Sequence, residues 1–372
     1  MKKQTGMVLG LLGAMCLSAG QAQEKSTPNG WVAECVGRVS LEIPGKYEVG
    51  ATPVEQLLQE QRGFTSGYIP SNFQDGQSAS YSAIGYQGQV LISHRLSTET
   101  LKQLQSAVQA EEQRAFKYVA QQNKLSKNGR VVIERLGIAP HHGDAHRTDN
   151  LLKVKLFADS HFMSYTRSGP DEKWDSEGKP FFESFIAGIH ARPNGDVPGQ
   201  SGVCMPYFFI ADNGTQRHFV GTTFRLIAHP DVTIFLEDKL SGEIDPKTQD
   251  ASKFTSDYIT DSFWTYYGEY GKIKVKSLWS LPVYRHTQLA GQKALESFAR
   301  IQREDGEEDF GYFSTARGDP NSKEYRPDLR FYVIRQAKHA KDKGIEPIGK
   351  EAFLKMAQAI AASVKRRPTT PN

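Results

Sequence analysis

The sequence predicts an α+β protein of two mixed domains, each an antiparallel sheet with packed helices. Segments with the two-residue period of strands and segments with the helical period follow one another without a regular βαβ rhythm, which disfavours a doubly wound sheet. Glycine (33 residues) and aromatic residues (10%) are plentiful, as suits a sheet-rich globular protein. A segment dense in proline and glycine, residues 193–202, divides the chain and is typical of a linker.

The length of the chain agrees with this division. Removal of residues 1–22 from the 372 residues would leave 350, which is comfortable for two hydrophobic cores. We therefore expect an N-terminal domain over residues 23–196 and a C-terminal domain over residues 197–372.

The first 22 residues have the three parts of an export signal. Lys2 and Lys3 supply a positive region, an apolar core runs from Met7 to Leu17, and Gly20-Gln21-Ala22 supplies the small residues that a signal peptidase reads. We expect cleavage after Ala22 and a periplasmic location.

The apolar core of that signal is too short to span a bilayer. No other segment of the sequence is apolar enough to cross a membrane, so we expect no stable membrane insertion. The alternatives are a buried first helix and a lipid anchor on Cys16. The anchor is disfavoured because Met15, directly before that cysteine, is not a small residue.

A strand is expected directly behind the signal. Apolar and polar residues alternate from Cys35 to Ile43, with the period of a half-buried strand. Pro44 and Gly45 should end it, because proline has no N–H to donate to a strand ladder.

In the rest of the first half, the clearest helix is expected over residues 98–121. Its apolar residues recur at helical spacing, and Ser97 or Thr98 can cap it. Strands are expected over residues 130–136 and 152–156, and a second helix over residues 180–189.

The second half repeats this mixture. Residues 218–226 and 232–236 are expected as strands, residues 294–302 and 310–313 as a hairpin over an acidic turn, and residues 329–334 as a further strand. A terminal helix should place four apolar residues on one face: Phe353, Ala357, Ile360 and Val364.

The exported chain keeps two cysteines, Cys35 and Cys204. In an oxidising compartment an isolated pair tends to form a disulfide, so we expect a bridge between them. The alternative is two buried free thiols, because a free cysteine packs like a small hydrophobic residue.

Composition and motifs argue against several functions. The net charge of +4 falls to +2 without Lys2 and Lys3. The sequence has no stripe of Lys and Arg of the kind that binds nucleic acid, so we expect no nucleic-acid partner. A hydrolase with a nucleophile elbow needs Gly-x-Ser-x-Gly, and the nearest run, Gly199-Gln200-Ser201-Gly202, ends in Val203. A glycine-rich phosphate loop and a Cys-x-x-Cys pair are also absent from the sequence. We therefore expect no catalytic residues and no cofactor.

One cluster has the composition of a metal site. His141, His142, Asp144 and His146 could together hold zinc. Their spacing matches no zinc-binding helix pattern, and the cluster follows Ala139-Pro140, which indicates a polar surface loop. We expect no metal site here.

Two stretches are rich in aromatic residues. Residues 63–88 contain five glycines and five serines, no Lys, Arg or Glu, and the aromatic residues Phe64, Tyr68, Phe73, Tyr81 and Tyr86. This is the composition of a protein-binding surface, and binding and core packing both remain open for it. The second stretch, residues 263–270, is more typical of a core.

The first strand also carries a family resemblance. Cys35-Val36-Gly37-Arg38 followed by Leu41-Glu42-Ile43-Pro44 resembles the opening of the periplasmic immunity proteins that neutralise type VI secretion lipase effectors. In that family the C-terminal domain begins after a Pro-x-x-x-Gly-x-Cys run, which residues 198–204 resemble.

Further short motifs extend the resemblance over nearly the whole exported chain. Residues 207–212 and 224–236 are similar to the first strands of the family's C-terminal domain. Residues 289–296 are similar to a later stretch, in which Lys293 takes the place of a second glycine.

The resemblance implies a function. Such proteins are not enzymes, and their two domains grip a cognate secreted phospholipase effector and block access to its catalytic serine. Two alternatives remain: a periplasmic metal-dependent hydrolase that uses the His141–His146 cluster, and an envelope structural or chaperone-like binding protein.

Overall fold

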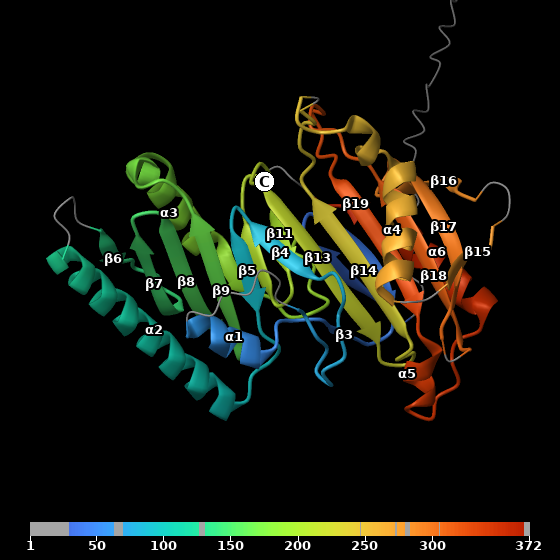
Figure 1. The fold of residues 1–372 in the computed structure, drawn as a ribbon, viewed down its shortest axis with the longest axis horizontal. Coiled ribbons are helices and arrows are strands. Elements are labelled where there is room, and N and C mark those ends of the chain that lie inside the picture. The colour runs from blue at the N-terminus through green and yellow to red at the C-terminus, as the bar shows by residue number, and fades with distance from the viewer. Residues whose placement is uncertain are drawn as a thin grey trace, which may run out of the picture.

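One antiparallel sheet runs through the whole molecule (Figure 1). The computed structural model describes residues 30–62, 70–125, 131–245, 247–271, 274–279, 283–304 and 306–367. Within them, 14 strands share this sheet, which passes directly from strands of the first half to strands of the second. The α+β prediction is therefore confirmed, with the two expected sheets joined edge to edge. The expected export signal lies outside the described residues.

In the N-terminal half, helices cover both faces of the sheet. Leu104 and Val108 of α2 cluster with Phe162, whereas the ring of Phe185 on α3 stacks 4.6 Å from that of Tyr165. Phe162 and Tyr165 lie three positions apart on β9, and side chains alternate between the faces of a strand, so these two point to opposite faces. Therefore α2 and α3 lie on opposite sides of the sheet. The elements are α1 (Val54–Gln61), β4 (Ala83–Tyr86), β5 (Gln89–Ile92), α2 (Thr98–Leu125), β6 (Ile133–Arg135), β7 (His142–Thr148), β8 (Leu151–Ala158), β9 (His161–Ser168) and α3 (Lys179–Gly188), which follows a short 3₁₀ helix (Asp171–Lys173) and a short π-helix (Trp174–Gly178).

The C-terminal half is layered in the same way. Phe263 of α4 stacks 4.3 Å from Phe313, and Phe353 of α6 lies 6.3 Å from Phe310, on the other face. The elements are β13 (His218–Leu226), β14 (Val232–Lys239), the turn Ala251–Phe254, α4 (Ser256–Gly271), β15 (Lys274–Ser277), β16 (Arg285–Leu289), β17 (Gln292–Gln302), β18 (Glu308–Ala316), β19 (Asp328–Arg335), α5 (Ala337–Lys341) and α6 (Lys350–Ser363).

The helices and the hairpin with the clearest sequence periodicity lie close to where the sequence predicts them. The helix expected at Thr98 begins there and continues to Leu125. The terminal helix buries Phe353, Ala357 and Ile360 as expected, whereas Val364 is buried just beyond the end of the helix at Ser363. The hairpin expected around the acidic turn is β17 and β18. Long amphipathic helices carry many repeats of their pattern, which is why they are readable without tertiary context.

The strand expected from Cys35 to Ile43 is wrong. The structure has two strands there, β1 (Trp31–Val36) and β2 (Val39–Pro44), which form a hairpin in which Val36 pairs with Val39. Gly37 has a φ of +58° and stands first in the two-residue turn. A glycine at that position favours a hairpin turn, and its place in the alternation concealed this signal. The end at Pro44 is confirmed.

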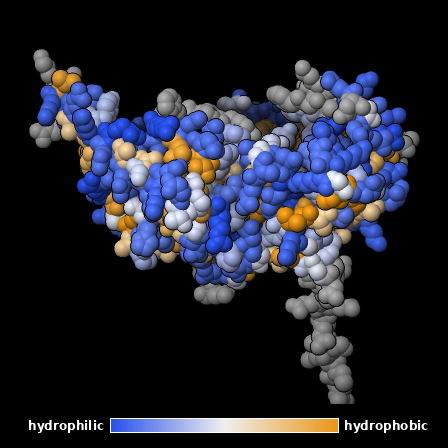
Figure 2. All heavy atoms as spheres, turned by 90° about the horizontal axis from the view of Figure 1, so that it is seen from below, coloured by the Kyte–Doolittle hydropathy of each residue, from blue (hydrophilic) through white to orange (hydrophobic). Residues whose placement is uncertain are grey.

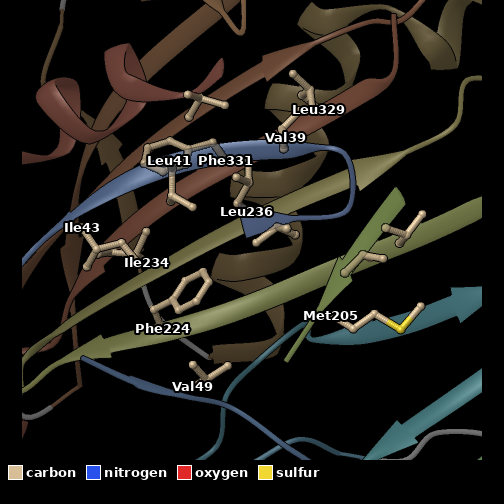
Figure 3. Close-up of a cluster of buried hydrophobic side chains, with 14 of the residues drawn as sticks. Val39, Leu41, Ile43, Val49, Met205, Phe224, Ile234, Leu236, Leu329 and Phe331 are labelled. Atoms are coloured by element: carbon tan, nitrogen blue, oxygen red, sulfur yellow. The ribbon is translucent and has the colours of Figure 1, made fainter. Parts of the chain in front are cut away.

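The hairpin lies across the sheet of the second half and forms the centre of its core (Figure 3). Val39, Leu41 and Ile43 of β2 point toward strands of the large sheet, where they meet residues including Phe224, Ile234, Leu236, Leu329 and Phe331. Because the same buried cluster includes Tyr86, Val154 and Tyr165 of the first half, the core continues across both halves.

Two small sheets complete the fold. β20 (Lys365–Arg366) pairs with β2, so the last described strand lies beside the first hairpin. β10 (Ile189–Ala191), β11 (Gly202–Met205) and β12 (Phe208–Ala211) form the other small sheet, and β3 (Tyr47–Val49) adds to β13. The predicted linker connects β10 to β11, and the division of the chain near residue 196 stays a prediction.

The expected disulfide is confirmed. Cys35 of β1 and Cys204 of β11 are bonded, with 5.8 Å between their Cα atoms and 169 positions between them in the sequence. The sulfurs are packed against Phe209 in a small buried cluster. The bridge therefore ties the first hairpin to the sheet that follows the linker.

We predict that replacing both cysteines by alanine lowers the free energy of unfolding by about 2–5 kcal/mol, because a long loop in the unfolded chain is no longer closed. Urea denaturation of the oxidised wild type and of the double variant measures the change. Reductant should lower the stability of the wild type by a similar amount and leave the variant unchanged. A reductant effect on the variant would contradict the prediction.

Candidate functional site

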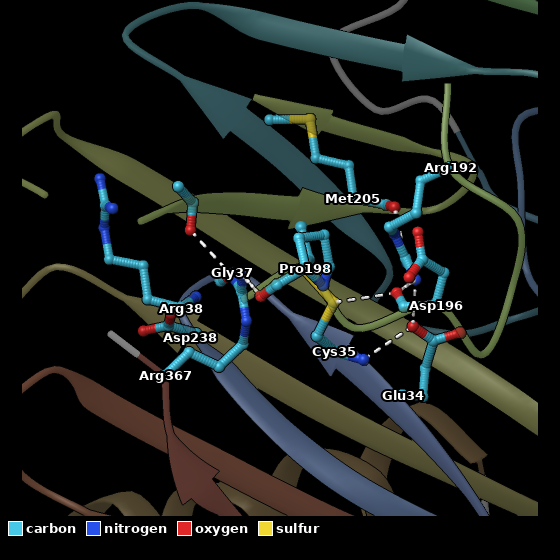
Figure 4. The surroundings of a disulfide bond; sticks show 12 residues. Glu34, Cys35, Gly37, Arg38, Arg192, Asp196, Pro198, Met205, Asp238 and Arg367 are labelled. Carbon is cyan, nitrogen blue, oxygen red and sulfur yellow. Dashed lines mark hydrogen bonds and ion pairs between the residues drawn. A yellow bond between two sulfur atoms is a disulfide. The ribbon is translucent and has the colours of Figure 1, made fainter. Parts of the chain in front are cut away.

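The turn of the first hairpin lies at the meeting point of the two halves (Figure 4). Gly37 and Cys204 exchange two backbone hydrogen bonds, each of 2.8 Å. A side chain at Gly37 would place its Cβ 2.3 Å from Oδ2 of Asp238. Glycine is thus required twice, for the left-handed backbone and for the close approach to Asp238.

A buried ion pair joins this turn to Asp212, the residue that directly follows β12. Arg38 is fully buried and donates two hydrogen bonds, of 2.7 and 2.6 Å, to the carboxylate of Asp212. The hydroxyl of Tyr86, at the end of β4, donates to the same carboxylate over 3.0 Å. Burial alone would lower the pKa of Arg38, but the hydrogen bond and charge of Asp212 raise it above its ordinary value.

A second buried ion pair fixes the linker to β1. Arg192 donates a 2.6 Å hydrogen bond to Glu34, and both side chains are almost completely buried. Glu34 also accepts a 2.5 Å hydrogen bond from the hydroxyl of Tyr47. Arg192 donates further to the carbonyl oxygens of Asp196 and Met205, over 2.7 and 3.1 Å. The start of the linker therefore has a defined path.

The other end of the linker is bound by the last described residue, Arg367. Its guanidinium donates to the carbonyl oxygens of Pro198, Gln200 and Gly202, over 2.6, 3.1 and 3.2 Å. Burial, together with the charges of Arg192 and Arg38, lowers the pKa of Arg367 to about 10.

A buried carboxylate completes the junction. Asp238 of β14 accepts 2.5 Å hydrogen bonds from the backbone N–H of Arg38 and from the hydroxyl of Tyr325. Nε2 of His218 lies 3.2 Å from the same carboxylate.

We call these groups the central lock, since they connect the first strands, the linker, the second half and the C-terminal segment. The central lock comprises Glu34, Cys35, Arg38, Arg192, Cys204, Asp212, Asp238 and Arg367. Of these residues, the sequence predicts a contact only for the two cysteines, and Arg38 stands in the motif that carries the family resemblance, without an expected partner. The signal for the remaining ones is a charged residue within or beside a strand, and such residues are mostly exposed.

The aromatic residues expected to bind a partner differ in how exposed their side chains are. Phe64 and Tyr68 lie outside the described residues. Phe73 and Tyr86 are 2% exposed and belong to the interior, where the guanidinium of Arg225 covers the ring of Phe73 at 4.4 Å. Burial therefore favours the packing alternative for these two. Tyr81 is 43% exposed, and binding by it stays a prediction.

The two aromatic stretches meet in space. Tyr81 packs against Tyr332 and Phe263, with ring centroids 5.9 and 6.5 Å apart. The core prediction for the second stretch is confirmed for Phe263, Trp264 and Tyr267, which pack against the sheet, whereas Tyr266 is 54% exposed. Exposed tyrosines thus lie at and near the contact between these stretches.

The histidine cluster does not converge, and the surface loop expected for it is wrong, because His142–Thr148 form β7 and His146 is buried. His141 directs Nε2 to the carbonyl oxygen of Ile186 at 2.9 Å, His142 is exposed, and Nδ1 of the buried His146 lies 3.0 Å from Asp144. In the part of the chain that the structure describes, no three His, Cys, Asp or Glu side chains are placed to share a metal ion. The hydrolase alternative therefore gains no ligand set from the fold.

The surface in Figure 2 is mainly hydrophilic. Its hydrophobic residues form small separate groups among the described atoms drawn there, which is ordinary for a folded protein. None of the described helices is long and apolar enough to cross a membrane.

We predict that Arg38→Ala lowers the free energy of unfolding by about 3–5 kcal/mol, because Asp212 keeps a buried charge without its cation. Urea denaturation measures the loss. Arg300→Ala is the matched control, since Arg300 pairs with Glu308 at the surface, where both side chains are about half exposed. It should cost less than about 1 kcal/mol. Equal losses in the two variants would contradict a special role for Arg38.

Comparison with known proteins identifies the fold. No protein-family model and no curated protein sequence matches the chain. Its structure is similar to that of TplEi, an immunity protein of the type VI secretion system (T6SS) from Pseudomonas aeruginosa. The TM-score is 0.56 at 12% identity, over 92% of this chain and 98% of that one.

Two further structures agree. TplEi complexed with an "L" peptide gives a TM-score of 0.54 at 12% identity, and a chain of the Tle4–Tli4 complex gives 0.54 at 13%. Each comparison covers 92% of this chain and 99% of the other. Along nearly its whole length, this protein therefore has the fold of the T6SS immunity protein TplEi, as the resemblance of its short motifs implied.

Proposed function

We propose that this protein is a periplasmic immunity protein that binds a type VI secretion phospholipase effector and blocks its active site with a two-domain clamp. The observation that carries the proposal is the fold shared with the immunity protein TplEi over 92% of the chain. The similarity to a chain of the Tle4–Tli4 complex supports a role in binding another protein.

The central lock supports the clamp mechanism. A clamp must hold two contact surfaces in a fixed relation, because any freedom between them is lost on binding and weakens the affinity. Here a disulfide and the buried ion pairs Glu34–Arg192 and Arg38–Asp212 fix the first hairpin and the linker to both halves. An extended frame of this kind can bury a standard interface of about 1,600 Å².

Binding rather than catalysis is the role that we assign. The sequence has no Gly-x-Ser-x-Gly run of its own. The His141–His146 cluster is distributed between a helix contact, solvent and a local pair with Asp144. The buried acids and bases of the central lock hold the chain segments together, and they have partners within the protein.

The periplasmic location rests on two observations. The sequence begins with the pattern of an export signal, and the structure contains the Cys35–Cys204 disulfide. Disulfides persist in oxidising compartments such as the periplasm and are rare in the cytosol.

We predict that the exported chain forms a 1:1 complex with the lipase encoded beside it, if that lipase carries Gly-x-Ser-x-Gly. Calorimetry should give a Kd below about 1 μM, corresponding to about −8 kcal/mol, and one equivalent should abolish hydrolysis of phospholipid. A lipase variant that lacks its catalytic serine should bind equally well, because inhibition acts by covering the site. Absence of binding, or binding without inhibition, would refute the proposal.

We predict that Tyr81→Ala weakens binding of the same lipase roughly tenfold, since exposed tyrosines are frequent hot spots of protein interfaces. Tyr118→Ala is the matched control, because Tyr118 is 62% exposed on α2. Urea denaturation of both variants separates lost contact from lost stability, as Tyr81 also packs on Tyr332. Unchanged affinity in folded Tyr81→Ala would remove this residue from the contact surface.

A further inference from the structure

A groove of about 560 Å³ lies where the sheet passes from the first half to the second. We call it the seam groove. Its walls come from the turn between β4 and β5, the end of β9, the beginning of β13 and the end of β14. Pairing of β4 with β13 brings these ends together, although they are far apart in the sequence.

The turn between β4 and β5, at Gln87 and Gly88, packs closely on both neighbouring strands and lines the seam groove. Gly88 approaches β9 so closely that a Cβ would lie 2.5 Å from the carbonyl oxygen of Thr166. Gln87 has a φ of +53° and donates its backbone N–H to the carbonyl oxygen of Arg217 over 3.0 Å. The turn is therefore fixed to both neighbouring strands, and no larger side chain fits at Gly88.

The charges that line the seam groove all have one sign. Arg167 of β9, Arg217 before β13 and Lys239 of β14 face it, whereas no Asp or Glu is among its lining residues. Among the described residues none of the three forms an ion pair, and the nearby Glu237 is buried and pairs with Arg330 instead. Glu237 still lies close enough to Lys239 for their charges to interact, so among the described residues the groove keeps an excess of positive charge.

Arg167 differs from an ordinary solvated arginine. Its guanidinium lies 4.1 Å from the ring centre of Phe181, and its Nη1 is buried without a hydrogen-bond partner in the described structure. Arg217 and Lys239 are exposed on the opposite wall. A buried donor without an acceptor is costly, so Arg167 keeps unmet hydrogen-bonding capacity beside the groove.

We propose that the seam groove binds an acidic, extended segment of a protein partner. The inference rests on the proposed function for the identity of that partner, and on charge complementarity for its chemistry. Carboxylates match the three cations, and a chain in extended form can enter a groove between strand ends, which a flat membrane surface cannot. The segment would lie across both halves of the protein.

The test uses a fluorescein-labelled hexaglutamate peptide, with anisotropy measured near 0.01 M salt, where the Debye length is about 30 Å. Wild type should bind it, should not bind hexaglutamine, and should lose affinity as salt is added. Arg217→Gln with Lys239→Gln should weaken binding at least about fivefold. The matched control is Lys274→Gln with Lys276→Gln, two exposed lysines on β15 with the same loss of charge. Equal losses in both double variants would overturn the inference.

Two further arms separate the alternatives. Vesicles of phosphatidylglycerol test a membrane surface as the ligand. If wild type binds the vesicles, the groove variant does not, and hexaglutamate fails to bind, the ligand of the groove is a lipid surface and not a protein segment.

The neighbouring lipase tests the link to function. If wild type binds the lipase and the groove variant binds it equally well, the inference fails while the proposed function stands. If hexaglutamate binds the groove and the lipase binds neither protein, the proposed function fails instead.

Discussion

The buried ion pair between Arg38 and Asp212 is the contact that commits the two halves of this protein to one arrangement. Removing two charges from water costs several kcal/mol per ion, and this cost is offset only when the geometry of the pair is good. Arg38 meets Asp212 only if the hairpin turn, the end of β4 and the strand after the linker are all in place. The pair thus selects an arrangement rather than adding much net stability.

The chain closes this arrangement from both ends. β1 and β2 enter the core of the second half, although they stand at the start of the first half, and Arg367 returns to bind the linker near Pro198. The disulfide adds a covalent connection at the same place. Because these contacts link residues more than 150 positions apart, they close large loops and have to be satisfied together.

Outside this frame, exposed aromatic and cationic residues gather at two places. Near α4, Tyr81 and Tyr266 are exposed around a packed aromatic cluster, while the seam groove presents cations without carboxylates. Aromatic anchors supply affinity at low entropic cost, and complementary charge supplies specificity and faster association. Tyr81 packs on Tyr332 of β19, α4 packs on the same sheet, and the groove lies between strand ends of that sheet, so one sheet supports both places.

The sequence by itself determined the features that depend on local periodicity or on simple counting. α2 and α6 follow from helical spacing, β17 and β18 from alternation around an acidic turn, and the disulfide from a single pair of cysteines in an exported chain. Only the tertiary structure decided that Gly37 forms a turn, that Arg38 and Glu34 are buried, and that Phe73 and Tyr86 belong to the interior. The reason is physical: whether a charge or an aromatic ring is buried depends on the partner that the fold brings to it. Asp212 and Arg192 come from segments that no local pattern connects to the first hairpin.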